Sequence, residues 1–396
     1  MTDDLYWDPF DTEIDTDPHP VWRRLRDEAP VYRNERFDFY ALSRHADVEA
    51  AHRDPKTFSS AHGTVLELMS SDPSPVQMMI FLDPPEHTRL RSLVSRAFTP
   101  RRVAEIEDHV RQICAGLLDP LVGSGGFDYL GDFGAVLPSA VISSLMGVPE
   151  DEREEVRGHI DQIFHLEPGQ GMINDTSFEA MIWLHGYYST LLEERRRRPA
   201  DDMISALTVV ETADTDGTTR RLGDEEILDF MQLLVTAGTE TVARLLGWAA
   251  VQLAANPGAR AELAADPALL PGAVEELLRH EAPSPVQGRW TTADVELHGT
   301  TVPADSKVLL LTGSAGRDER KYPDPDRFDI HRTFDGHVSF GQGIHFCVGA
   351  ALARLEGRVA LEETLTRFPV WEVDHERAVR LHTSTVRGYA SVPITV

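Results

Sequence analysis

Cysteine is scarce in this chain, which has only two among its 396 residues. The two, Cys114 and Cys347, lie far apart in segments of different character, so we expect no disulfide framework. This usage favours a reducing compartment and therefore a cytoplasmic protein. A zinc site is also excluded, because no second Cys/His cluster has usable spacing. Residues 1–8 have neither a basic start nor an apolar centre, so we expect no signal peptide or anchor there.

Basic residues and long apolar runs are also in short supply. The 38 Lys and Arg residues are outnumbered by 65 Asp and Glu residues, which leaves a net charge of −27. This balance argues against nucleic acid or an anionic membrane as a partner. No run of about 18 apolar residues occurs, which argues against a membrane-spanning helix. No low-complexity linker divides the chain, so we expect residues 1–396 to form a single domain.

The hydrophobic pattern predicts a mainly α protein with a minor β component near both ends. Residues 31–33 and 37–42 are typical of a short hairpin, and a helix is expected over 45–53. Regularity stops over residues 58–85, which contain several prolines and methionines and are typical of a long functional loop. A series of helices follows, and the tail over 380–396 alternates like strands.

A long helix is predicted in the second half of the chain. Acidic residues at 224–226 suit its start, and the apolar pattern runs from Ile227 to Ala255, where Asn256 and Pro257 end it. Its middle, residues 237–241, reads Ala-Gly-Thr-Glu-Thr, although a buried helix should be apolar there. The hydroxyl of the last threonine can bond the carbonyl four residues back and open the helix locally. Taken alone, the stretch also fits an exposed glutamate beside a threonine satisfied by its own backbone.

Residues 340–349 read Phe-Gly-Gln-Gly-Ile-His-Phe-Cys-Val-Gly and form the most informative stretch. Gly341, Gly343 and Gly349 allow close approach, so the loop can press flat against a planar cofactor. We expect the N–H groups at the start of the following helix to lower the pKa of Cys347 and to hold it as the metal-binding thiolate. The alternatives are a small buried apolar side chain, as Cys114 suggests, or a nucleophile with His345 as its base.

This stretch resembles the haem-binding loop of the cytochromes P450, whose pattern Phe-Gly-x-Gly-x-His-x-Cys-x-Gly is met at every fixed position. The resemblance implies a cytochrome P450 fold that binds haem b, which is iron protoporphyrin IX. It implies that Cys347 is the axial ligand of the iron, the only metal ligand expected. It places Phe340, Gly341 and Gly349 among the cofactor-binding residues of the loop.

Residues 237–241 resemble the oxygen-binding segment of the P450 central helix, Ala/Gly-Gly-x-Asp/Glu-Thr. The resemblance places Ala237 and Gly238 at the haem, where Gly238 would leave space beside it. It gives Glu240 and Thr241 the catalytic task of passing protons to oxygen. This acid and alcohol pair favours dioxygen and electrons over peroxide as the oxidant.

Glu276 and Arg279 are three residues apart and meet on one face of a predicted helix. They form either an ordinary surface pair or the buried P450 Glu-x-x-Arg motif, which locks its helix to the cysteine loop. A third member normally comes from the segment before that loop. Arg327 and Arg332 are both available there, and the sequence does not choose between them.

The two propionates of haem call for cations at one edge of the pocket, and the fork of arginine suits a carboxylate best. The resemblance implies four propionate partners: His87 and Arg91, four apart on one helical face, together with Arg289 and His345. Taken singly, each is more often a solvated charge or a core histidine.

The resemblance spans residues 22–387 and follows the soluble bacterial members most closely. It implies a monooxygenase that places one atom of O2 into a C–H or C=C bond of a hydrophobic small molecule, with electrons from a ferredoxin and ferredoxin reductase. Five arginines form a basic island over 89–102, a candidate docking site for an acidic ferredoxin: Arg89, Arg91, Arg96, Arg101 and Arg102. Alternatives are a haem-thiolate sensor or carrier without turnover, and a colourless cysteine hydrolase.

The sequence does not name the substrate. The segments expected to wall its pocket are residues 58–85, 164–181 and 235–238, Val286, and residues 383–386. Methionines in the first two segments suggest a yielding apolar wall.

Overall fold

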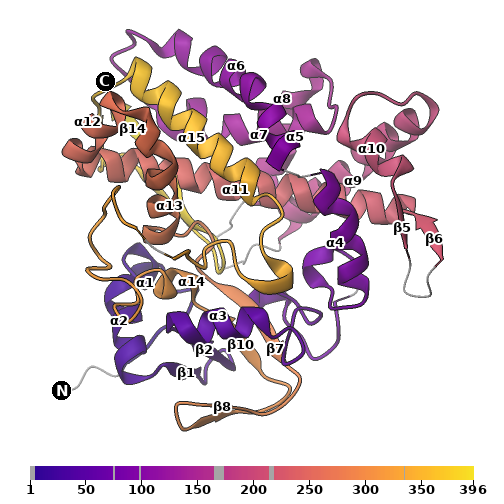
Figure 1. The fold of residues 1–396 in the computed structure, drawn as a ribbon, viewed down its shortest axis with the longest axis vertical. Coiled ribbons are helices and arrows are strands. Elements are labelled where there is room, and N and C mark those ends of the chain that lie inside the picture. Colours follow the sequence, from indigo (N-terminus) through magenta and orange to yellow (C-terminus); the bar gives the residue numbers. More distant parts are fainter. Residues whose placement is uncertain (1–4, 75, 98–99, 165–173, 214–217, 334) are drawn as a thin grey trace.

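The protein is described here from a computed structural model, which covers residues 5–74, 76–97, 100–164, 174–213, 218–333 and 335–396. Helices make up most of this part of the chain, and short strands form small sheets near both ends and also in its interior, over 126–128, 211–221 and 287–310 (Figure 1). The predicted mainly α fold with a minor β component is therefore confirmed. Among the described residues, no helix is both long and apolar enough to cross a lipid bilayer.

The helices lie, in chain order, at α1 Thr12–Thr16, α2 His19–Glu28, α3 His45–Arg53, α4 Glu86–Ala97, α5 Pro100–Glu105, α6 Glu107–Leu118, α7 Val136–Leu145, α8 Arg153–Ile163, α9 Asp175–Arg197, α10 Met203–Val209, α11 Asp224–Ala255, α12 Pro257–Ala265, α13 Leu270–His280, α14 Thr312–Ala315 and α15 Ala350–Arg367. The strands lie at β1 Val31–Asn34, β2 Phe39–Leu42, β3 Phe58–Ser59, β4 Gly126–Asp128, β5 Glu211–Ala213, β6 Thr219–Arg221, β7 Gln287–Thr291, β8 Val295–Leu297, β9 Thr300–Val302, β10 Lys307–Leu310, β11 Glu372–Val373, β12 Val379–His382, β13 Arg387–Ser391 and β14 Pro393–Thr395.

The main sheet joins the two halves of the chain. Its order is β1-β2-β10-β7-β3, so the predicted N-terminal hairpin of β1 and β2 is confirmed and pairs with strands more than 240 residues later. Strand β10 runs parallel to β2, with Leu309 opposite Ala41, and antiparallel to β7. In Figure 1 this sheet lies with α1, α2 and α3 at one end of the molecule, away from most of the helices.

Helix α11 is the predicted long helix and crosses the helical part of the molecule (Figure 1). At its start, the Glu226 carboxylate accepts a hydrogen bond of 2.9 Å from the Gly223 N–H, which satisfies one of the free N–H groups of the first turn. Asn256 caps its other end before Pro257, as predicted. Helices α7, α9, α13 and α15 pack against it, and most of its residues are buried.

Two tryptophans tie α11 to the C-terminal strands. Trp248 Nε1 donates to the Arg387 carbonyl of β13 at 3.1 Å, and Trp371 Nε1 donates to the Ala250 carbonyl at 2.9 Å. Both indoles are almost fully buried, so each adds a large apolar contact while its N–H stays paired. The position of α11 is therefore set partly by the last residues of the chain.

Candidate active site

The loop before α15 is shaped by two glycines with positive φ. Gly341 and Gly343 both have φ of +68°, and Cys347 N–H donates to the Phe340 carbonyl at 2.9 Å across the turn. A Cβ added at Gly343 would lie 2.6 Å from the carbonyl oxygen of His52 on α3, closer than side chains approach. Gly349 stands at the N-cap of α15, two residues after Cys347. The loop is thus held flat against α3, and the thiol stands at the start of a helix.

Desolvation by the surrounding atoms raises the pKa of the Cys347 thiol above its usual value, although the residue as a whole is solvent-exposed. The N–H groups of Gly349 and Ala350 and the charges of Arg91 and Arg354 act in the opposite direction, as expected from the helix start. Desolvation is the larger effect, so the net shift is upward. The N–H groups at the helix start therefore lower this pKa as predicted, and the thiolate form of Cys347 remains a prediction. Cys114 is fully buried in the core, and burial likewise raises its pKa.

The four predicted propionate partners come together beside this loop. The rings of His87, on α4, and His345 lie 4.2 Å apart between centroids. Arg91 interacts electrostatically with both histidines and with Cys347, and Arg289, on β7, interacts with His345. Residues far apart in the sequence therefore gather at one place.

His87 and Arg289 are buried, Arg91 and His345 are half-buried, and the group is short of counter-charge. Burial, followed by the neighbouring positive charges, lowers the pKa of His87 to about 4 and of His345 to about 2. Burial also lowers the pKa of Arg289 to about 10, although Asp83 acts against it. Asp83 itself accepts hydrogen bonds from the Ser59 hydroxyl, at 2.5 Å, and from the Ser60 N–H. The site can therefore accept further negative charge.

A fifth residue of this cluster was missed from the sequence. His52, on α3, is 4% exposed, and its ring interacts electrostatically with Arg289 and His345. No motif marks this histidine, because its place beside the loop follows from the packing of α3.

The polar stretch of α11 contains the predicted Thr241 hydrogen bond but not the predicted local opening of the helix. Thr241 Oγ1 donates to the Ala237 carbonyl at 2.8 Å, and the helix continues through this turn. Ala237 is exposed, although its neighbours in α11 are largely buried. A Cβ added at Gly238 would lie 3.1 Å from Ile142 Cδ1 of α7. The missing Cβ at Gly238 therefore permits a close contact between α11 and α7, and its predicted place beside the cofactor remains a prediction.

Glu240 is buried next to Arg244 on the following turn of α11. The two side chains are about nine-tenths buried, and Arg244 Nε lies 3.1 Å from Glu240 Oε1. Burial raises the pKa of Glu240, Arg244 lowers it, and Asp161 of α8 raises it further. The spacing of four residues is the signal that could have revealed Arg244 in the sequence. The net effect favours a carboxyl that holds its proton more firmly than an exposed glutamate.

The buried Glu-x-x-Arg alternative is the correct one for Glu276 and Arg279 on α13. Neither side chain is exposed, and the guanidinium donates two hydrogen bonds of 2.7 Å to the carboxylate. Arg279 Nη1 also donates to the carbonyls of Gly316 and Pro325, each at 2.8 Å. The pair therefore fixes the segment that leads to the cysteine loop, and buried charges with full pairing are expected to be costly to break.

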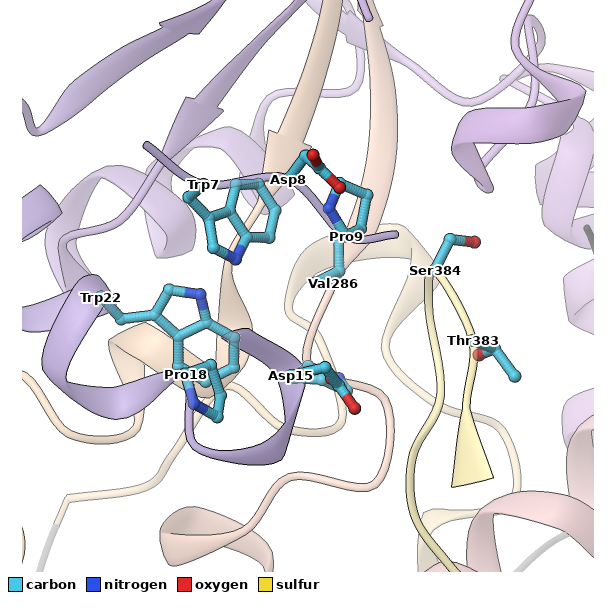
Figure 2. Close-up of a pocket in the computed structure, with 10 residues that line it drawn as sticks. Trp7, Asp8, Pro9, Asp15, Pro18, Trp22, Val286, Thr383 and Ser384 are labelled. Carbon is cyan, nitrogen blue, oxygen red and sulfur yellow. The ribbon is translucent and has the colours of Figure 1, made fainter. Parts of the chain in front are cut away.

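The structure describes part of the segments that are expected to wall the substrate pocket. Thr385 Oγ1 donates to the Val286 carbonyl at 2.7 Å, so two predicted wall segments touch. Figure 2 shows Val286, Thr383 and Ser384 beside Trp7 and Trp22 around a cavity of about 10 Å³. That volume holds about one water molecule, so this cavity is no substrate pocket. Within the predicted wall segment 164–181, residues 165–173 lie outside the described residues.

The basic island of the sequence is partly neutralised. Arg89 Nη2 pairs with Glu226 of α11 at 2.5 Å, and its side chain is largely buried. Arg91 faces the cluster beside Cys347. These two arginines are therefore not part of an exposed docking surface, which corrects that expectation. The side chains of Arg96, Arg101 and Arg102 lie outside the described part of the chain.

The residues present fit a flat, dianionic cofactor with a metal ion. Both ring nitrogens of His87 and Nε2 of His345 are buried without a hydrogen-bond partner among the described residues, as expected for groups that await an acceptor. The glycine loop offers a surface without side chains, and the Cys347 thiol is a suitable soft ligand. In the described ranges, no group of three His, Cys, Asp or Glu residues could hold a metal ion by itself.

Comparison with known proteins agrees with the site. Residues 35–391 match the family model of cytochrome P450. Cytochrome P450 130 of Mycobacterium tuberculosis (strain ATCC 25618 / H37Rv) is 42% identical over 392 residues, which cover 96% of this chain and 95% of that protein. Vitamin D(3) 25-hydroxylase of Pseudonocardia autotrophica is 39% identical, with coverages of 96% and 94%. The structure of CYP109Q5 from Chondromyces apiculatus superposes with a TM-score of 0.88 at 35% identity, with coverages of 98% and 97%.

The fold and these matches define a haem-binding oxidoreductase. The chain belongs to the cytochrome P450 family, and its relatives above are bacterial members. It is therefore a monooxygenase that uses O2, an organic substrate and redox partners.

Proposed function

We propose that this P450 hydroxylates or epoxidises an apolar small molecule, with haem b bound through Cys347. The observation that supports the proposal is the place of the thiol, at the start of α15 and within electrostatic reach of Arg91. When bound there, haem b supplies the activation of O2 by two electrons and two protons, with one oxygen atom going to the substrate and one to water.

Different residues of the chain would bind different parts of the cofactor. Cys347 Sγ would bind the iron, and Phe340, Gly341 and Gly349 would line the loop beneath the ring. His87, Arg91, Arg289 and His345 would bind the two propionates, because each lies in a buried cluster that can accept negative charge. Ala237, which is exposed on α11, would lie against the other face of the ring.

Glu240 and Thr241 would handle the protons. The raised pKa of Glu240 lets its carboxyl hold a proton closer to neutral pH than an exposed glutamate does. The Thr241 hydroxyl, which donates to Ala237, would orient the acceptor of that proton. A sensor or carrier without turnover is the second candidate function, and the buried acid beside a hydroxyl disfavours it because a binder needs no proton source.

Two observations bear on the substrate class. Met69 and Met79 are buried in the segment expected to wall the pocket, and methionine adapts to varied apolar shapes. One relative is named for the hydroxylation of vitamin D(3), an apolar molecule. We infer that an apolar substrate of this general kind is oxidised here, and a screen for substrate-induced changes in the haem spectrum would identify it.

We also propose that a ferredoxin, reduced by its reductase, supplies the electrons. The support is from the sequence, where Arg96, Arg101 and Arg102 follow one another without an acidic residue until Glu105. Docking steered by charge should slow steeply as the salt concentration rises. Reversing Arg96 and Arg102 to Glu should lower the reduction rate and flatten its salt dependence, and an unchanged rate and slope would place the docking surface elsewhere.

The absorbance of the reduced carbon-monoxide complex tests the proposed ligand. The native protein should show the thiolate-haem band, C347A should lose it, and C114S should keep it because Cys114 is a core residue. A thiolate band that survives in C347A would overturn the assignment. Product formed in step with electron supply would separate a monooxygenase from a sensor or carrier.

A further inference from the structure

His52 is a buried polar residue without a visible purpose in the fold. Its side chain is 4% exposed in the last turn of α3, and neither ring nitrogen has a hydrogen-bond partner among the described residues. A neutral imidazole has one N–H and one nitrogen lone pair, so burying it with both nitrogens unpaired is costly. A leucine would fill the same place at lower cost, so the histidine indicates a partner that the described residues do not provide.

The ring of His52 lies against the cysteine loop. A Cβ built on Gly341 would lie 3.7 Å from its Cε1 and 3.8 Å from its Nδ1, so the backbone of Gly341 lies next to this edge of the ring. The carbonyl of the same histidine touches the loop at Gly343. The imidazole is therefore held by both its backbone and its ring at the edge of the candidate haem site.

The charged groups around His52 are those of the propionate cluster. Burial and then the charge of Arg289 disfavour a positive charge on the His52 ring, and His52 in turn lowers the pKa of His345. Arg289 is buried, and its Nη1 donates to the Gly288 carbonyl at 2.6 Å. A neutral imidazole beside a buried guanidinium suits a carboxylate, since Arg289 balances the charge while the ring offers one N–H.

We propose that His52 is a further propionate-binding residue, which donates a hydrogen bond to the same carboxylate edge of the cofactor as Arg289 and His345. This inference rests on the proposed haem site and deepens it. The cluster then comprises three imidazoles and two guanidinium groups, namely His52, His87, His345, Arg91 and Arg289. The hydrogen bond also satisfies a ring nitrogen that otherwise remains unpaired.

The test measures the rate at which the loaded enzyme releases haem to an excess of apomyoglobin. We expect H52L to release haem about 10-fold faster than the native protein, the effect of losing one hydrogen bond to a charged group. H52Q, which keeps a donor, should restore much of the difference. H45L is the matched control, because His45 is also on α3, is 6% exposed and has an unpaired Nε2, but packs against Tyr322 away from the cluster.

A second cofactor separates the proposed contact from a packing effect. In proteins reconstituted with the dimethyl ester of the same haem, which lacks propionate charges, H52L and the native protein should release the cofactor at nearly equal rates. An equal acceleration with both cofactors would show that His52 acts through packing and would overturn the proposal. Unchanged haem release in H52L would overturn it as well.

The proposed function itself would fail in a different way. A native protein that takes up no haem gives no release rate to compare, whereas a failure of the His52 proposal leaves a coloured enzyme with a normal thiolate band. If H52L folds poorly, the release rates of H52Q and H52N are measured with haem and with its dimethyl ester instead. A contact with the propionate must still make the effect of the substitution differ between the two cofactors.

Discussion

Arg332 Nε lies 3.2 Å from the buried carboxylate of Glu276 and donates to it. Arg327 instead has a largely exposed side chain, and its nearest acid is Asp329 at 3.7 Å. The choice that the sequence left open therefore falls on Arg332. Its guanidinium also donates to the carbonyls of Pro323 and Asp324. One side chain therefore binds both the buried pair and the irregular segment before the cysteine loop.

Removing one partner of this buried pair should destabilise the protein strongly. We expect E276A to lower the free energy of unfolding by about 3–5 kcal/mol, because Arg279 would be left as a buried, unpaired charge. R332A should cost less, and R327A should stay within about 0.5 kcal/mol of the native protein because its side chain is exposed. Denaturant unfolding of the three variants measures this order, and an equal loss in R327A and R332A would contradict it.

The hydroxyl of Thr241 should matter for coupling rather than for stability. In T241A we expect the product formed per electron to fall several-fold while peroxide rises, because the proton carrier beside Ala237 is gone. T241S keeps the hydroxyl and should stay close to the native yield. Product and peroxide are both measured per electron consumed. An unchanged product yield in T241A would show that Thr241 is not on the proton path.

Glu356 of α15 should make the stability depend on pH. Both of its carboxyl oxygens are buried without a partner among the described residues, and burial raises its pKa to about 8. The unfolded chain, in which this pKa is about 4.3, loses the proton first as pH rises. The stabilisation from the protonated group is therefore complete below about pH 4 and is lost as pH rises through about 8.

The variant E356Q keeps the shape of the side chain and cannot ionise. Its free energy of unfolding should change less between pH 6 and pH 9 than that of the native protein, and E356Q should be the more stable of the two at pH 9. The control E362Q alters a glutamate of the same helix that pairs with Arg111, so its pH profile should keep the native fall. Parallel profiles for E356Q and the native protein would rule out a neutral Glu356.

Two glycines with similar backbone angles should respond differently to alanine. Gly343 and Gly336 have φ of +68° and +76°, but only at Gly343 would a Cβ meet backbone, the His52 carbonyl at 2.6 Å. G336A should therefore cost roughly 1–2 kcal/mol from its backbone angle alone. G343A should cost more and should also reduce haem uptake, which is read from the ratio of haem absorbance to protein. Equal haem uptake in the two variants would contradict the role of the close approach.

The sequence predicted those features that depend on local pattern. The α11 helix, the β1 and β2 hairpin, α3 and the strands of the tail are confirmed, because their apolar periods and end signals lie within a few residues. The family is confirmed through the loop at 340–349. That residues 1–396 form a single domain and that the site residues have their assigned roles remain predictions.

What the sequence could not provide depends on packing between distant segments. The partner of Glu276, the contact of Gly238 with Ile142 and the place of His52 each require two elements to meet in space. The pKa of Cys347 is a balance between burial and local charge, and only the burial was invisible in the sequence. Arg89 was counted as an exposed charge because Glu226, its partner, lies 137 residues later.

The last strand has a consequence for how the chain is made. Strand β14 pairs with β11 and with β4, whose residues 126–128 are made much earlier. The hairpin of β1 and β2 likewise waits for β10. A ribosome releases these partners far apart in time, so the sheet of β4, β14 and β11 can form only after residues 393–395 have been made. A chain that stops before residue 393 would therefore leave β4 without its partner strand.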